Sequence, residues 1–133
     1  MTLVIDASVA VKWVLPEDGA ERAAALRGQP DELIAPTLIA AEIGSTMRKQ
    51  VAANQLAVAE ARSAAEIATG LLNRLVPIPE LAGRALELAI ELRHPIYDCF
   101  YLALAEREDV ALVTADEELI AKAKSGKIKV RPL

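Results

Sequence analysis

The segment Leu3-Val4-Ile5-Asp6-Ala7-Ser8 decides how the rest of this chain is interpreted. Leu3 to Ile5 is an apolar run without polar alternation, which predicts a strand buried on both faces, as in the centre of a parallel sheet. An aspartate follows at once, and ligands of open α/β sheets bind beyond the carboxyl ends of the strands. We therefore expect Asp6 at a binding site. The alternative is that Asp6 serves only as a turn or cap residue.

Strands alternate with helices along the remaining chain, which predicts an α/β fold with a parallel sheet and helices on both faces. Ser8 and Thr37 are expected to cap helices, and Pro77 makes its strand a poor central one. Neither an internal repeat nor a linker divides the chain. The expected strands are 3–5, 33–35, 76–78, 111–114 and 128–130, and the expected helices are 8–15, 20–27, 38–53, 57–73, 79–93, 97–108 and 116–124.

The composition favours one domain and excludes several classes of protein. The 133 residues are 53% hydrophobic, and the net charge of −4 argues against a general nucleic-acid coat protein. This net charge does not argue against an enzyme that binds nucleic acid locally through metal ions. The single cysteine, Cys99, excludes an intrachain disulfide. With no signal peptide and no apolar run of about 18 residues, we expect a cytoplasmic protein.

Three further acids break the usual pattern of solvated charge. Glu42 lies beside the apolar stripe of its predicted helix, where a bare carboxylate is costly, although a mid-helix glutamate is commonly just solvated. Asp98 opens a helix among apolar and aromatic residues, and the alternative is a simple interaction with the helix dipole. Asp116 follows the strand 111–114 as Asp6 follows its own. The alternative there is a capping box between Thr114 and Glu117, with Asp116 in the first turn.

The four acids are more informative together than singly. Like charges should not converge without compensation, and oxygen-rich sites suit Mg²⁺ or Mn²⁺. Two such ions about 3.5–4 Å apart can activate a water and stabilise the leaving oxygen of a phosphodiester. Other chemistries find little support, because His94 has no Ser or Cys partner by spacing. Cys99 and Trp13 are predicted to be buried, and Lys12 to be solvated.

Four segments in this order resemble PIN-domain ribonucleases, and in length and motif order the chain resembles a VapC-type toxin of a toxin–antitoxin pair. The resemblance covers essentially residues 1–133 as a single PIN-like nuclease domain. It implies a three-layer α/β/α sandwich around a parallel sheet, and a metal-dependent endoribonuclease that an antitoxin blocks. It also implies that Mg²⁺ or Mn²⁺ is bound by catalytic acids, with two supporting hydroxyls. The segments are Val4-Ile5-Asp6-Ala7-Ser8-Val9, Ala41-Glu42-Ile43, Tyr97-Asp98-Cys99-Phe100-Tyr101-Leu102-Ala103-Leu104-Ala105 and Leu112-Val113-Thr114-Ala115-Asp116. The implied acids are Asp6, Glu42, Asp98 and Asp116, and the implied hydroxyls are those of Ser8 and Thr114.

Three other functions find less support in the sequence than a metal-dependent ribonuclease. A catalytically silent PIN-like module that only binds RNA or a protein has no reason to hold four acids together. A haloacid-dehalogenase-type phosphatase normally has a second acid two residues after the first, and here that position is Ser8. A receiver domain needs a pair of acids after its first strand.

The surplus of apolar residues predicts protein partners. We expect an amphipathic antitoxin segment to pack on the helices between Leu38 and Leu72, since large apolar patches mark interaction sites. The same surplus favours a homodimer.

Overall fold

The computed structural model describes residues 1–28 and 31–133, in which five parallel strands form one sheet in the order β3-β2-β1-β4-β5. The apolar run at the start of the chain forms the central strand. Its Leu3 pairs with Leu33 on one side and with Ala111 on the other. The strands are β1 (Thr2–Ile5), β2 (Glu32–Pro36), β3 (Arg74–Val76), β4 (Ala111–Thr114) and β5 (Val130–Pro132).

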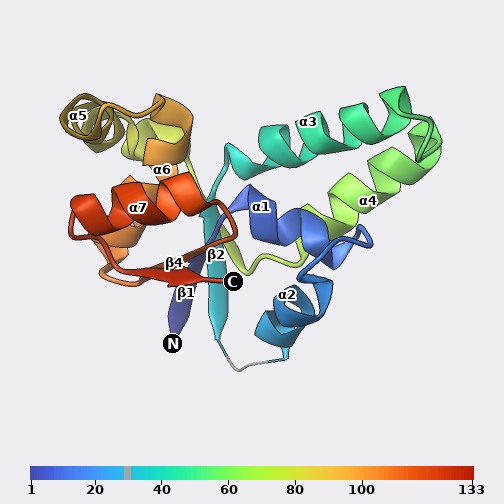
Figure 1. The fold of residues 1–133 in the computed structure, drawn as a ribbon, viewed down its shortest axis with the longest axis horizontal. Helices are drawn as coiled ribbons and strands as arrows, with labels where there is room; N and C mark the ends of the chain where they lie inside the picture. The colour runs from blue at the N-terminus through green and yellow to red at the C-terminus, as the bar shows by residue number, and fades with distance from the viewer. Residues whose placement is uncertain (29–30) are drawn as a thin grey trace.

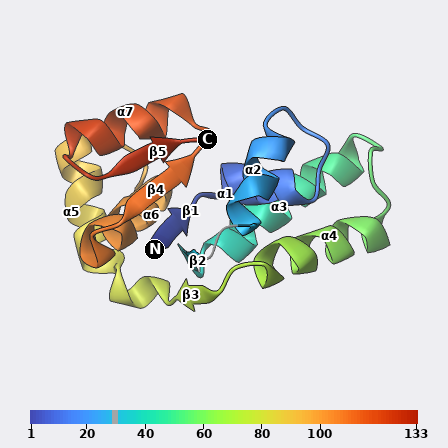
Figure 2. The same cartoon turned by 90° about the horizontal axis from the view of Figure 1, so that it is seen from below.

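Helices cover both faces of this sheet. Figures 1 and 2 show α1 to α4 on one side and α5 to α7 on the other, with α3 and α4 forming a hairpin that projects away from the strands. The expected three-layer α/β/α sandwich is confirmed. No helix in the described ranges is long and apolar enough to cross a membrane. The helices are α1 (Ala7–Ala10), α2 (Ala20–Arg27), α3 (Ile39–Ala52), α4 (Val58–Gly70), α5 (Ala82–Leu92), α6 (Ile96–Glu108) and α7 (Glu117–Ser125), with 3₁₀ turns at Val11–Trp13 and Ile78–Glu80.

The strand order explains this division of the helices. The chain moves outward from β1 to β2 and β3, and then returns across the sheet to β4 and β5. Because crossovers between parallel strands are right-handed, the outward and return connections lie on opposite faces. The direction reverses between β1 and β4. The crevice beyond the carboxyl ends of these two strands is therefore the place where ligands bind in open α/β sheets.

Helix α6 is the central helix of the second face. Every residue from Cys99 to Ala105 is buried, and α6 packs on β1, β2 and β4. Burial raises the pKa of the Cys99 thiol to about 11, as expected for a packing residue. Trp13 also packs against the core, and its indole nitrogen donates to the carbonyl oxygen of Ala23 at 2.9 Å.

Both expected caps are wrong, because the two hydroxyls bond to other groups. Asp6, not Ser8, stands at the N-cap of α1, and the Ser8 hydroxyl donates to the Asp6 carboxylate. Leu38 stands at the N-cap of α3, and the Thr37 hydroxyl accepts the backbone N–H of Ile78 at 3.2 Å.

Four elements are displaced from their expected positions. The strand expected at 76–78 is β3 at the sheet edge, and it ends before Pro77. The helix expected at 8–15 is α1 followed by a 3₁₀ turn, and the helix expected at 79–93 begins only after the second 3₁₀ turn. The last strand lies at Val130–Pro132 because residues 126–128 close the end of α7, where the Ile128 N–H donates to the carbonyl of Ala123 at 2.8 Å.

Candidate functional site

Asp6 lies directly beyond the carboxyl end of β1 and is only 5% exposed. Its Oδ2 accepts hydrogen bonds from the Ser8 hydroxyl at 2.6 Å and from the Thr114 hydroxyl at 2.7 Å. Burial raises the pKa of Asp6 above its ordinary value, and the charge of Asp98 raises it further, whereas the two hydroxyls act in the opposite direction. Asp6 is therefore a carboxylate whose negative charge is only partly compensated.

The two hydroxyls join the end of β1 to the turn that follows β4. Ser8 Oγ accepts the backbone N–H of Ala115 at 3.0 Å, and Thr114 Oγ1 accepts that of Asp116 at 3.0 Å. Both hydroxyls also donate to the same oxygen of Asp6. Their geometry suits the supporting role that the sequence predicts, which stays a prediction.

Glu42 reaches the same crevice from the first turn of α3 and is half-buried. Its Oε1 accepts a hydrogen bond of 2.6 Å from the hydroxyl of Tyr101, a fully buried residue of α6. Burial raises the pKa of Glu42 to about 7, and the charges of Asp6 and Asp98 add to this effect, while the Tyr101 hydroxyl opposes it. Burial also raises the pKa of Tyr101, so Tyr101 remains a proton donor at neutral pH.

Asp98 lies in the first turn of α6, and a buried histidine holds it. Its Oδ2 accepts a hydrogen bond of 2.7 Å from Nε2 of His94. The other ring nitrogen, Nδ1, lies 3.6 Å from a carboxylate oxygen of Glu118. The His94 side chain is 3% exposed.

The sequence argument missed His94 and Tyr101 as partners of the acids. The four-residue spacing of His94 and Asp98 gave no helical signal, because His94 precedes Pro95 and lies outside α6. Tyr101 gave no such signal, because it lies 59 residues from Glu42 in the chain.

Asp116 differs from the other three acids because it caps a helix. It is the N-cap residue of α7, and its Oδ1 accepts the backbone N–H groups of Glu118 at 2.9 Å and Leu119 at 3.3 Å. The alternative of a capping box between Thr114 and Glu117 is therefore wrong, because the Thr114 hydroxyl donates to Asp6. The Thr114 hydroxyl links Asp116 to Asp6, since it accepts the N–H of the first and donates to the carboxylate of the second.

The structure thus brings three acids into one electrostatic group. The charge of Asp98 acts on Asp6, and the charges of Asp6 and Asp98 act on Glu42. Within residues 1–28 and 31–133, no lysine or arginine pairs with these acids, and no group of three or more His, Cys, Asp or Glu side chains is arranged so that it could hold a metal ion. The donor set of carboxylates and hydroxyls still fits a hard cation such as Mg²⁺ or Mn²⁺. A cation would also relieve the repulsion between these acids.

Comparison with known proteins places this geometry in a family. The family model of the PIN domain matches residues 3–125. Ribonuclease VapC1 of Mycobacterium tuberculosis is 36% identical over 122 residues, which cover 89% of this chain and 88% of that protein.

Two solved structures show the same fold at lower identity. The chain is similar to VapBC2 from Rickettsia felis bound to a DNA fragment from its promoter, with a TM-score of 0.75 and 16% identity over 100% of this chain and 99% of the other. A toxin–antitoxin complex from Klebsiella pneumoniae gives a TM-score of 0.65 and 19% identity, with 90% of each chain covered.

Proposed function

This chain belongs to the PIN-domain family, and we propose that it is an endoribonuclease of the VapC type that requires Mg²⁺ or Mn²⁺ and acts as the toxin of a toxin–antitoxin pair. One observation carries the proposal: Asp6, Glu42 and Asp98 converge at the point where the strand order reverses, and the pKa values of Asp6 and Glu42 are raised. The relationship to ribonuclease VapC1 supports RNA as the substrate.

The four predicted acids would hold the metal, and their hydrogen bonds leave oxygens for it. The hydroxyls of Ser8 and Thr114 both use one oxygen of Asp6, Tyr101 uses one of Glu42, and His94 uses one of Asp98. The cap bonds of Asp116 both use Oδ1. When bound at such oxygens, a divalent ion lowers the pKa of a water and stabilises the leaving oxygen of the phosphodiester.

The neighbouring nucleophiles fit hydrolysis by water better than covalent catalysis. The Cys99 thiol is buried with a pKa of about 11, and the Ser8 hydroxyl already donates to Asp6. His94 is engaged with Asp98 and is not available as a base for Ser8. Ser8 and His94 therefore position the acids, Cys99 packs in the core, and none of the three attacks the substrate.

Cleavage of RNA by the pure protein tests the proposal. Cleavage should require Mg²⁺ or Mn²⁺, stop on chelation, and fall by orders of magnitude in Asp98→Asn. Glu87→Gln, at an exposed position of α5, is the matched control and should cleave like the parent. Robust cleavage in EDTA would contradict the metal requirement. RNA binding without any cleavage would favour the silent module.

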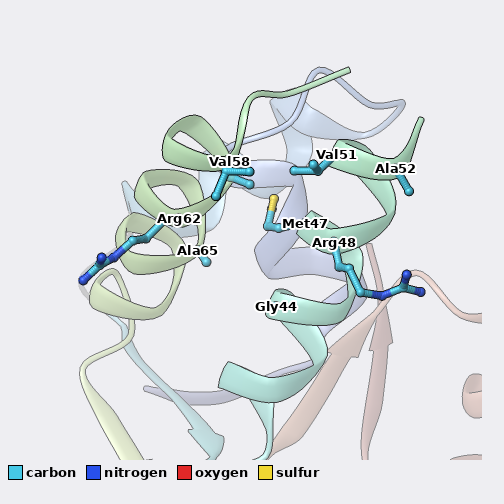
Figure 3. Close-up of a pocket in the computed structure, with 9 residues that line it drawn as sticks. Gly44, Met47, Arg48, Val51, Ala52, Val58, Arg62 and Ala65 are labelled. Carbon is cyan, nitrogen blue, oxygen red and sulfur yellow. The ribbon is translucent and has the colours of Figure 1, made fainter. Parts of the chain in front are cut away.

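The antitoxin is proposed to bind in an apolar groove between α3 and α4. The groove has a volume of about 470 Å³, and Met47, Val51, Val58 and Ala65 line the gap between the helices (Figure 3). Val58 is 74% exposed and borders this groove, and contiguous exposed apolar surface marks interaction sites. An amphipathic helix that lays its apolar face in the groove would cover it.

Co-expression with the product of the adjacent reading frame tests this groove. Val58→Glu should weaken retention of the product on the tagged protein, because it places a charge in the groove. Ile67→Glu makes the same change at a 56% exposed position of α4 outside the groove and should retain the product. Equal retention by both variants would contradict the groove as the binding site.

A further inference from the structure

A second pocket lies beside the acids, between α3 and the segment that follows β1. Its volume is about 250 Å³. Ser8 and Val11 line one side, and Glu42, Ser45, Thr46 and Lys49 of α3 line the other. The pocket is smaller than the roughly 300–1,000 Å³ of sites for drug-sized ligands, so it suits a single small unit.

The side of the pocket formed by α3 changes in charge along the helix. Glu42, Ser45, Thr46 and Lys49 are spaced by three, four and seven residues, which places them on one face. At 1.5 Å of rise per residue, Lys49 lies about 10 Å along the axis from Glu42. The wall therefore leads from a carboxylate at the proposed metal site, past two hydroxyls, to an ammonium group.

The charge at the far end is available to a ligand. Lys12 pairs with Glu17 and Lys129 pairs with Asp109, whereas Lys49 forms no ion pair within residues 1–28 and 31–133. Lys49 is exposed on α3. A lysine ammonium binds phosphate as a point charge. An anionic group is therefore favoured at Lys49 and is disfavoured beside Glu42 until a cation is present.

We propose that this pocket holds the phosphate and ribose of the RNA strand next to the bond that is cleaved, with Lys49 on the phosphate and Ser45 and Thr46 on the sugar–phosphate oxygens. The proposal rests on the proposed function, since it assumes that the acids bind the reacting phosphate. No aromatic side chain lines the pocket, so bases have nothing there on which to stack. Contacts to sugar and phosphate position a strand without reading its sequence.

RNA-binding affinity tests the subsite without depending on cleavage. Fluorescence anisotropy measures the binding of labelled single-stranded RNA in EDTA at several salt concentrations. Lys49→Gln should weaken binding of an oligouridine and of a mixed sequence alike. Loss of one phosphate contact should reduce the salt dependence by about 0.7 in logarithmic slope, so raising salt from about 50 to 200 mM should weaken the parent about 2.6-fold more than the variant. Lys124→Gln removes the same charge from an exposed position of α7, on the other face of the sheet, and should behave like the parent.

Cleavage kinetics with Mn²⁺ give a second readout. Lys49→Gln and Thr46→Val should raise KM for RNA and leave kcat close to that of the parent, because neither residue is proposed to touch the reacting phosphate. Unchanged affinity and salt slope in Lys49→Gln would overturn the subsite, and so would equal losses in Lys49→Gln and Lys124→Gln. Weaker antitoxin binding with unchanged RNA binding would assign the pocket to a protein instead. Failure of the parent to cleave RNA would overturn the proposed function, and the anisotropy result would then decide only whether the pocket binds RNA.

Discussion

Glu42→Gln is expected to remove a large part of the pH dependence of folding stability. Glu42 is half-buried beside two other acids, and its pKa is raised to about 7. Glutamine removes the charge and keeps an oxygen that can accept the hydrogen bond of 2.6 Å from Tyr101. The substitution therefore isolates the cost of ionising this carboxyl group in the folded protein.

The sign follows from the direction of the shift. Between the ordinary pKa of 4.5 and about 7, the unfolded chain has lost the Glu42 proton while the folded protein still holds it. Stability from this group is thus greatest at low pH and falls as pH rises toward 7. A shift of about 2.5 units corresponds to roughly 3 kcal/mol, and solvent screening of a half-buried group reduces this to about 2 kcal/mol.

Urea unfolding in EDTA at pH 5 and pH 8 measures this difference. Glu42→Gln should gain about 2 kcal/mol of unfolding free energy relative to the parent on going from pH 5 to pH 8. Asp6 also has a raised pKa and remains in both proteins, so the difference between them reports Glu42. Glu87→Gln, at an exposed position, is the control. Identical pH dependence of the parent and Glu42→Gln would refute the reasoning.

The metal should reverse the ranking of the two proteins. At pH 8 and about 100 times the dissociation constant, Mn²⁺ should stabilise the parent by about 2.7 kcal/mol. Glu42→Gln should respond much less, because it lacks one proposed ligand. An equal response would show that Glu42 does not bind the metal.

Three further predictions concern single contacts. Asp98→Asn should leave the metal-free protein as stable as the parent or slightly more so, since it removes one of the repelling charges. In thermal melts, Mn²⁺ should raise the melting temperature of this variant less than that of the parent. An equal rise in both proteins would exclude Asp98 as a ligand. Tyr101→Phe should lose about 1 kcal/mol of stability and raise the pKa of Glu42 further. Titration calorimetry should therefore find weaker Mn²⁺ binding than in the parent at pH 7, and most of the lost affinity should return at pH 8.5. If the protein is a homodimer, its exposed apolar residues on α5, Leu86 and Ile90, are candidates for the interface, and Ile90→Glu should halve the mass found by light scattering.

Local patterns in the sequence predicted the parallel sheet and the position of two acids beyond its central strands. An apolar strand followed by an acid occurs at Asp6 and again at Asp116, and both acids do lie beyond adjacent strands. The pattern could not distinguish their surroundings. Asp6 is buried under two hydroxyls, whereas Asp116 is half-buried and caps α7. This difference depends on which residues of the folded chain reach each carboxylate.

The hydroxyl and aromatic partners show the same limit. Ser8 and Thr37 carry ordinary capping signals, yet their hydroxyls accept the backbone N–H groups of Ala115 and Ile78, which only tertiary structure brings near. Tyr101 stands in a run of apolar residues, and only the folded chain shows that its hydroxyl reaches Glu42. A buried tyrosine packs its ring in the core and uses its hydroxyl for a hydrogen bond, so its position in the sequence does not reveal the second role.

The hydrogen bonds to the three acids hold each carboxylate in place but leave the repulsion between them for a metal ion to relieve. Each of the three coupled acids is held by its own donor: Asp6 by hydroxyls, Glu42 by Tyr101 and Asp98 by His94. None of these donors bridges two acids, so their mutual repulsion is not relieved within the described residues. Fixing each carboxylate separately lowers the entropic cost of binding an ion, while the remaining repulsion favours any cation that enters. Under the proposed function, this combination favours tight metal binding, and it predicts that losing a supporting donor weakens metal affinity more than it weakens the fold.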